Sequence, residues 1–81
     1  MSAEEKVATT LNLRGLMCPL PVVKIAQAIT QVQVGEMIEA YATDPGVLAD
    51  IPAWARSSGH ELISIEKLDS KEIRFVVKRT K

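Results

Sequence analysis

The only cysteine of this 81-residue chain, Cys18, stands in a run of residues suited to chemistry on sulfur. Two prolines, Pro19 and Pro21, follow it, and an apolar pattern with helical spacing begins directly behind them. A thiol at the start of a helix lies near unpaired N–H groups and the positive end of the helix dipole, which together stabilise an anion. Reactive cysteines with a lowered pKa recur at such positions. We therefore predict that Cys18 has a lowered pKa and, since it has no partner cysteine, that it carries a small group covalently. A persulfide anion on the same sulfur would be stabilised in the same way.

Three residues are predicted to position this site, and a fourth to add charge to it. Gly15 lets the loop before the cysteine approach closely, and Pro19 and Pro21 stiffen the first helical turn while removing two N–H donors. Arg14 adds positive charge if its side chain points toward the sulfur. The alternative for Cys18 is a small buried apolar residue, which is common for free cysteines.

The other reactive residues are too few for several further kinds of site. A lone cysteine cannot form an intramolecular disulfide, which fits a reducing compartment. A metal site needs three or four ligands, whereas the chain has one cysteine and one histidine, His60, far apart in sequence. Pairing of Cys18 with His60 for nucleophilic catalysis stays formally open, but a hydrolase also requires an orienting group and a substrate cleft. We predict no metal and no other cofactor.

The first half of the chain predicts a strand, a helix and a buried strand. Residues 9–13 alternate apolar and polar side chains, as a short strand does. Behind Cys18, an apolar stripe at helical spacing predicts a helix that fades by Gln33; its members are Val22, Ile25, Ala26 and Ile29. Residues 37–43 are mostly apolar on both faces, which is typical of a strand in the interior of a sheet.

The next segment predicts a helix interrupted near its start. Asp44 is the expected N-cap, with Pro45 at the first helical position. Because proline removes a backbone donor and clashes within a helix, Pro52 predicts a short turn over residues 45–49 and a restart capped by Asp50.

The last third predicts a helix end and a hairpin. Gly59 is the expected C-terminal cap of the second helix. Residues 61–68 alternate with Ile63 and Ile65 on one face, and residues 72–79 alternate again, close enough to form a hairpin. The inward side chains of the last strand are predicted to be Ile73, Phe75 and Val77.

These elements define the expected fold and domain organisation. The order β-α-β-α-β-β predicts an α+β fold, a two-layer α/β sandwich with two helices on one face of a four-stranded mixed sheet. A chain of 81 residues allows one domain at most. We expect a disordered N-terminal tail over residues 1–8 and a single domain over residues 9–81.

Composition and charge exclude some functions and leave one surface open. The formal net charge is zero, so the domain as a whole is not a basic nucleic-acid binder. The polar start of the chain and the lack of a membrane-length apolar run predict a cytoplasmic protein. Residues 67–81 carry six basic and two acidic side chains, which predicts either solvated strand-face charge or a partner surface. The basic residues proposed for a partner or anion surface are Arg14, Lys24, Arg74 and Lys78.

The run from Leu11 to Lys24, with Cys18-Pro19-Leu20-Pro21 at its centre, resembles the signature of the TusA/SirA-like sulfur-carrier (sulfurtransferase) family. The hallmark of that family is Cys-Pro-x-Pro at the start of the first helix. Later stretches are similar as well, so the resemblance covers residues 9–79; they are Ala42 to Pro45, Asp50 to Trp54 and Gly59 to Leu62.

This resemblance implies the same sandwich and a specific role for Cys18. The cysteine would accept sulfane sulfur as a persulfide from a donor such as a cysteine desulfurase or a rhodanese-like protein, and pass it to a downstream acceptor protein. In different relatives the sulfur goes to tRNA thiolation, molybdenum-cofactor assembly or sulfur oxidation. The lack of a second cysteine excludes a two-thiol relay within this chain.

The sequence is therefore compatible with two functions. The first is a monomeric, sulfurtransferase-type sulfur carrier; whether it is an enzyme in its own right stays open. The second is a non-catalytic RNA- or protein-binding regulatory module that uses the basic C-terminal strand face, with Arg74, Lys78 and Arg79. Direct nucleic-acid binding is not expected, because few basic residues share one face and Phe75 is predicted to point inward.

Overall fold

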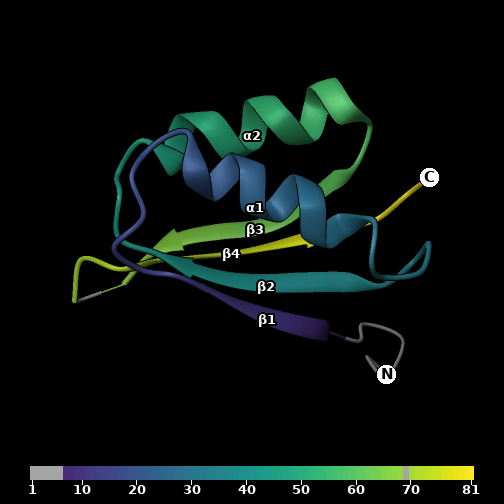
Figure 1. Cartoon of the computed structure of the whole chain (residues 1–81), viewed down its shortest axis with the longest axis horizontal. Coiled ribbons are helices and arrows are strands. Elements are labelled where there is room, and N and C mark those ends of the chain that lie inside the picture. The colour runs from purple at the N-terminus through teal and green to yellow at the C-terminus, as the bar shows by residue number, and fades with distance from the viewer. Residues whose placement is uncertain (1–6, 69) are drawn as a thin grey trace.

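The structure is a computed structural model that describes residues 7–68 and 70–81. Two helices cover one face of a four-stranded sheet, so the predicted α+β fold and element order are confirmed (Figure 1). In chain order the elements are β1 (Val7–Leu13), α1 (Leu20–Ile29), β2 (Met37–Ala42), α2 (Val47–Ser58), β3 (Glu61–Lys67) and β4 (Ile73–Lys78).

The sheet is mixed, with the strand order β1-β2-β4-β3. β1 and β2 are parallel, and both β2–β4 and β3–β4 are antiparallel, so the predicted interior strand and hairpin are confirmed. Parallel strands end at the same edge of a sheet. The loops that follow β1 and β2 therefore meet beside the starts of α1 and α2, on the left of the view (Figure 1).

The core lies between the sheet and the helices. Ile25 of α1 and Ile51 of α2 are fully buried, as is Phe75 of β4, and such burial stabilises the fold by about 1.5–3 kcal/mol per side chain. The inward positions predicted for β4 are confirmed. In α1 the predicted stripe is correct at Ile25 and Ile29, whereas Ala26 is only half-buried.

The predicted break in the second helix is wrong. α2 runs without interruption from Val47 to Ser58 and contains Pro52 in its interior. Val47, Ile51 and Ala55 recur at helical spacing and are all buried, and this tertiary packing holds the helix through the proline. Pro52 lies close to the N-terminus of α2. Its missing N–H leaves one carbonyl, that of Leu48 in the first turn, without its helical hydrogen bond.

The predicted alternation along the third strand is also wrong. Pairing of β3 with β4 shifts register between Leu62 and Ser64, which leaves Ile63 as the extra residue of a bulge. Leu62 and Ile65 consequently both pack against the core, while Ile63 is exposed.

The first strand begins inside the N-terminal tail that the sequence predicts. β1 begins at Val7, so the last two residues of the predicted tail, Val7 and Ala8, belong to the sheet. Residues 1–6 of that predicted tail lie outside the described residues. Within the part of the chain that the structure describes, no helix is long and apolar enough to cross a membrane.

Candidate functional site

The loop after β1 and the loop after β2 are joined by two hydrogen bonds from backbone N–H groups. The N–H of Gly15 donates to Thr43 Oγ1 at 2.9 Å, and the N–H of Cys18 donates to Asp44 Oδ2 at 2.7 Å. Asp44 also accepts a bond from the N–H of Gly46 at 3.0 Å through its other oxygen. These backbone donors, Gly46 first and then Cys18, lower the pKa of Asp44. Asp44 is therefore ionised, and its carboxylate joins the two loops.

Asp44 does not cap α2 as the sequence predicts. The N-cap is Gly46, and the residues before it form a tight turn in which the N–H of Val47 donates to the Asp44 carbonyl at 3.2 Å. The side chain of Asp44 is occupied by Cys18 and Gly46 instead. The same carboxylate that would have capped a helix therefore holds the cysteine loop in place.

The thiol of Cys18 is exposed and faces a second carboxylate. Its Sγ donates to Asp50 Oδ2, in the first turn of α2, at 2.8 Å. The exposure rules out the alternative of a buried apolar cysteine. The residue that contacts the sulfur comes from a different helix from the one that follows the cysteine.

The predicted lowering of the Cys18 pKa is wrong, because the pKa is raised. The hydrogen bond to Asp50 is the largest cause, followed by partial desolvation and the charges of Asp50 and Asp44. The N–H groups expected to stabilise a thiolate point elsewhere: that of Cys18 bonds Asp44, and that of Leu20 donates to the Met17 carbonyl. In this state the sulfur is a protonated thiol paired with a carboxylate.

The three predicted positioning residues each anchor the loop in a different way. Gly15 has φ +82°, in the left-handed region that favours glycine, while a Cβ there would meet no atom within 4 Å. Pro19 is the N-cap of α1, follows a cis peptide bond, and accepts the N–H of Val23 at 3.1 Å. Pro21 is fully buried. An exposed thiol thus lies three positions from a residue fixed in the core.

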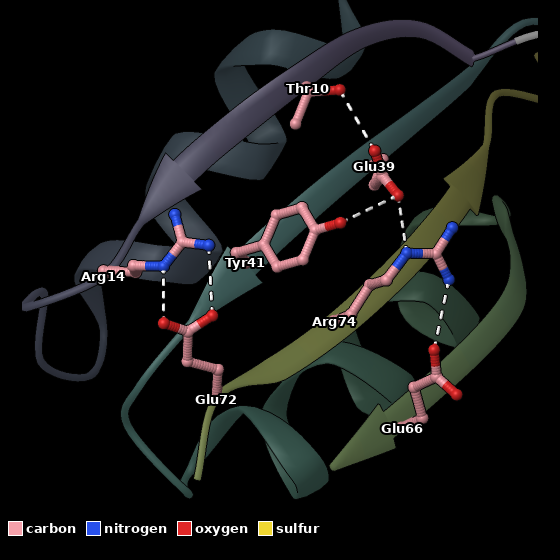
Figure 2. Close-up of polar contacts among 7 residues, drawn as sticks. All are labelled: Thr10, Arg14, Glu39, Tyr41, Glu66, Glu72 and Arg74. Atoms are coloured by element: carbon pink, nitrogen blue, oxygen red, sulfur yellow. Dashed lines mark hydrogen bonds and ion pairs between the residues drawn. The ribbon is translucent and has the colours of Figure 1, made fainter. Parts of the chain in front are cut away.

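Arg14 lies on the other side of the sheet and does not add charge to the sulfur. Its guanidinium forms two hydrogen bonds to Glu72, at 2.9 and 3.0 Å, and sits 4.7 Å from the centroid of the Tyr41 ring (Figure 2). This pairing raises the pKa of Arg14 and lowers that of Glu72. The expectation that Arg14 supports the thiolate is therefore not met.

Arg74 is also engaged within the molecule. On the helix-free face of the sheet, its guanidinium bonds Glu39 at 2.5 Å and Glu66 at 3.4 Å (Figure 2). Glu39 accepts two further bonds, from the hydroxyls of Thr10 and Tyr41. The hydrogen bond from Arg74 is the main cause of the lowered pKa of Glu39. Arg74 is a member of an ion-pair network, and its charge is not free for a partner.

Of the remaining predicted basic residues, Lys78 lies on the same face of β4 as Arg74, whereas Arg79 and Lys24 lie elsewhere. Arg79 lies beyond the end of β4 and donates to the backbone carbonyls of Val32 and Lys81. Lys24 is exposed on α1, in the helical layer, and Lys78 is half-buried at the end of β4. The basic C-terminal strand face of the sequence is thus divided among separate structural roles.

The possible pairing of Cys18 with His60 is excluded by distance along α2. Cys18 contacts Asp50 in the first turn of this helix, and His60 follows the C-cap residue Gly59. The eight residue steps of helix from Asp50 to Ser58, at about 1.5 Å each, separate the two ends. His60 accepts a bond from the N–H of Thr80 at 3.2 Å and packs against Trp54, with ring centroids 5.7 Å apart. The contacts of His60 are therefore structural ones near the C-terminal end of α2.

Sequence reasoning missed Asp50, and it also missed the exposure of apolar side chains on the elements that carry the site. Large apolar side chains are exposed on the loop and helix turns that carry the site: Met17 at 73%, Leu20 at 46%, Val23 at 42% and Leu48 at 42%. Exposed apolar side chains gathered in one region are typical of interaction sites. The sequence did contain one signal for the position of Asp50. A helix between two strands allows them to be parallel, and parallel strands bring together the residues that follow them.

The fold and the site together define a class: a small two-layer sandwich that presents one exposed thiol on the loop before its first helix. The sequence model described as Sulfurtransferase TusA matches residues 9–79, and this chain belongs to that family. The predicted family resemblance is therefore confirmed.

Individual relatives extend this similarity. A protein of Archaeoglobus fulgidus named "Putative sulfur carrier protein" is 45% identical over 67 residues, which is 83% of this chain and 87% of the relative. A relative of the same description in Aquifex aeolicus is 42% identical over 69 residues, 85% of this chain; the chain spans only 35% of that protein. The solved structure of a SirA-like protein from Desulfitobacterium hafniense has the same fold, with a TM-score of 0.78 and 15% identity over 90% of this chain and 99% of that one.

Proposed function

We propose that this protein is a sulfur carrier that accepts sulfane sulfur on Cys18 and passes it to an acceptor protein. The observation that carries the proposal is the exposure of this lone thiol on a loop tied down by Gly15, Asp44 and the buried Pro21. Membership of the sulfurtransferase TusA family and the names of several relatives support it. The thiol is accessible to a second protein, while the loop that bears it is held in one position.

The loading step is an exchange between two sulfur compounds. The sulfur of Cys18 attacks the terminal sulfur of a donor persulfide, and the donor's S–S bond breaks with its electron pair leaving on the donor thiolate. The product is a persulfide on Cys18, and delivery repeats the exchange with an acceptor. No net oxidation occurs, so the chain needs no redox partner of its own.

The partners in this proposal are a sulfur-donor protein, such as a cysteine desulfurase or a rhodanese-like protein, and a downstream acceptor in the cytoplasm. The exposed side chains of Met17, Leu20 and Leu48 support docking at the sulfur, because apolar area drives association. The destination is tRNA thiolation, molybdenum-cofactor assembly or sulfur oxidation. A carrier must release both partners, so we expect small, transient interfaces to a monomer.

The alternative, a non-catalytic RNA- or protein-binding module, loses its main support. It depended on free charge at Arg74, Lys78 and Arg79. Arg74 pairs with Glu39 and Glu66 and Arg79 bonds backbone carbonyls, so Lys78 alone of the three is left for a partner. Such intramolecular pairs would have to be broken for these residues to bind a partner.

The test is intact-protein mass spectrometry without reductant, after incubation with a cysteine desulfurase and free cysteine. We expect a gain of one sulfur mass that reductant reverses and that Cys18→Ser abolishes. Cys18→Ser should keep the wild-type circular dichroism spectrum, because the side chain it changes is exposed. No gain with the desulfurase, with rhodanese and thiosulfate, or with polysulfide would overturn the proposal.

A further inference from the structure

We infer that Asp50 is the base that takes the thiol proton when Cys18 attacks its sulfur donor. This inference rests on the proposed sulfur-carrier function and assigns the proton transfer within it to one residue. It makes Asp50 a catalytic residue, since its carboxylate touches the reacting sulfur.

The geometry of Asp50 suits a general base. Its Oδ2 lies 2.8 Å from the Cys18 sulfur, within the distance at which a side chain can accept a proton directly. The backbone holds it there: the N–H of Asp50 donates to the Gly46 carbonyl at 2.9 Å, and the next residue, Ile51, is fully buried. The carboxylate is thus presented to the thiol by the rigid first turn of α2.

The second carboxylate of the site cannot do the same work in this arrangement. Both oxygens of Asp44 already accept backbone N–H groups, from Cys18 and from Gly46. Its bond is to the backbone of Cys18, whereas the bond of Asp50 is to the sulfur. Asp44 therefore positions the loop, and Asp50 is left to handle the proton.

The step balances with the groups present. As a bond forms between Sγ of Cys18 and the terminal sulfur of the donor persulfide, the thiol proton moves to Oδ2 of Asp50. The donor's S–S bond breaks, and its electron pair leaves on the donor sulfur. The proton on Asp50 then passes to that thiolate, so the sum is thiol plus persulfide giving persulfide plus thiol.

This arrangement also favours unloading. A persulfide is a stronger acid than a thiol, so the loaded group is an anion beside the regenerated carboxylate of Asp50. Like charges at such short range repel each other. The terminal sulfur is therefore driven away from the protein surface, toward an acceptor.

The test follows the rate at which Cys18 attacks a neutral disulfide, dithiodipyridine, whose released thiopyridone absorbs light. This probe requires the same attack of sulfur on sulfur and no donor protein. For the wild type we expect the rate to level off toward mildly acidic pH, because the thiol–carboxylate pair reacts without prior ionisation. A thiol without a base loses about tenfold in rate per pH unit below its pKa, since only the thiolate reacts.

Asp50→Asn is the decisive variant. It keeps the size of the side chain and removes the base, so the level region should disappear and the rate should keep falling about tenfold per pH unit. Because Asp50 is also the main cause of the raised Cys18 pKa, the sloping profile of the variant should lie at lower pH than that of a thiol with the wild-type pKa. In heavy water the wild type should react more slowly in the level region, and the variant should not show this isotope effect. Circular dichroism checks that α2 is intact.

Asp44→Asn is the matched control. It removes an equal charge near the sulfur but not the hydrogen bond to it, so its profile should move to lower pH and keep the level region. An Asp50→Asn profile that levels off like the wild type, with the same isotope effect, would overturn the inference. So would a wild-type profile without a level region, a result that needs no variant.

The two proposals fail separately. Given long incubation with the desulfurase, Asp50→Asn should still gain one sulfur mass, because the base changes the rate of loading and not its end point. Absence of that gain in the wild type would overturn the sulfur-carrier function, whatever the disulfide kinetics show.

Discussion

The two sides of this small domain differ in whether their charged side chains are paired with opposite charges. On the helix-free face of the sheet, Arg74 lies between Glu39 and Glu66, so opposite charges neutralise one another (Figure 2). At the start of the helices, Asp44 and Asp50 flank Cys18, and no cation forms an ion pair with either among residues 7–68 and 70–81.

This difference separates stability from reactivity. The paired charges of the sheet face are satisfied and have no proton to exchange at neutral pH. At the cysteine, an anionic carboxylate can be tolerated because the site is exposed and its partner is a proton donor, the thiol. The thiol therefore keeps its proton until a base removes it, whereas a neighbouring lysine or arginine would favour the thiolate.

The largest expected effect comes from placing a cation beside Cys18, as Arg74 stands beside Glu39 on the sheet face. Asp50→Lys replaces the cause of the raised Cys18 pKa by a cation, so the pKa should fall below that of the wild type. Titration of thiolate absorbance measures it, and alkylation by iodoacetamide at neutral pH should become about tenfold faster. An unchanged titration would mean that Asp50 does not govern the thiol.

The next effect tests how firmly the cysteine loop is built. Gly15→Ala places a side chain at φ +82°, which should lower the free energy of unfolding by about 1–2 kcal/mol in urea titrations. Gly46→Ala is its control: Gly46 has φ −59°, and a Cβ there meets Asp44 at an ordinary 3.5 Å. Equal losses in both variants would contradict a conformational role for Gly15.

A smaller effect is expected on the sheet face. Glu39→Gln removes the charged acceptor of Arg74 and should lower the free energy of unfolding by about 1 kcal/mol. Persulfide loading should not change, because Glu39 and Cys18 lie on opposite sides of the sheet. A loss of loading with the fold intact would show that the two regions are coupled.

The smallest effect is a change in the pH dependence of stability. Because Arg74 lowers the pKa of Glu39 in the folded state, its stabilisation is present above the unfolded value of 4.5 and is lost as pH falls through the lower folded value. As the pH is lowered through this acidic range, the melting temperature of Glu39→Gln should therefore fall less steeply than that of the wild type. Equal slopes in the two proteins would contradict the role of the Arg74–Glu39 pair.

Local patterns were sufficient for most of the fold. The apolar spacing of α1, the two-sided apolar character of β2 and the alternation of β4 each reflect burial, which repeats with the period of the element. The prediction failed where packing overrode a local preference. Pro52 remains inside α2 because Ile51 and Ala55 are buried on either side of it, and β3 accommodates a bulge at Ile63.

The sequence by itself singled out the candidate residue. Cys18 is the lone cysteine of the chain and lies between Gly15 and two prolines, so the proposed sulfur chemistry rests on it. Only the tertiary structure decided the protonation of that sulfur. Asp50 lies far from Cys18 along the chain, and the parallel pairing of β1 and β2 brings its carboxylate to 2.8 Å from the thiol. A pKa depends on neighbours in space, and a sequence lists only neighbours along the chain.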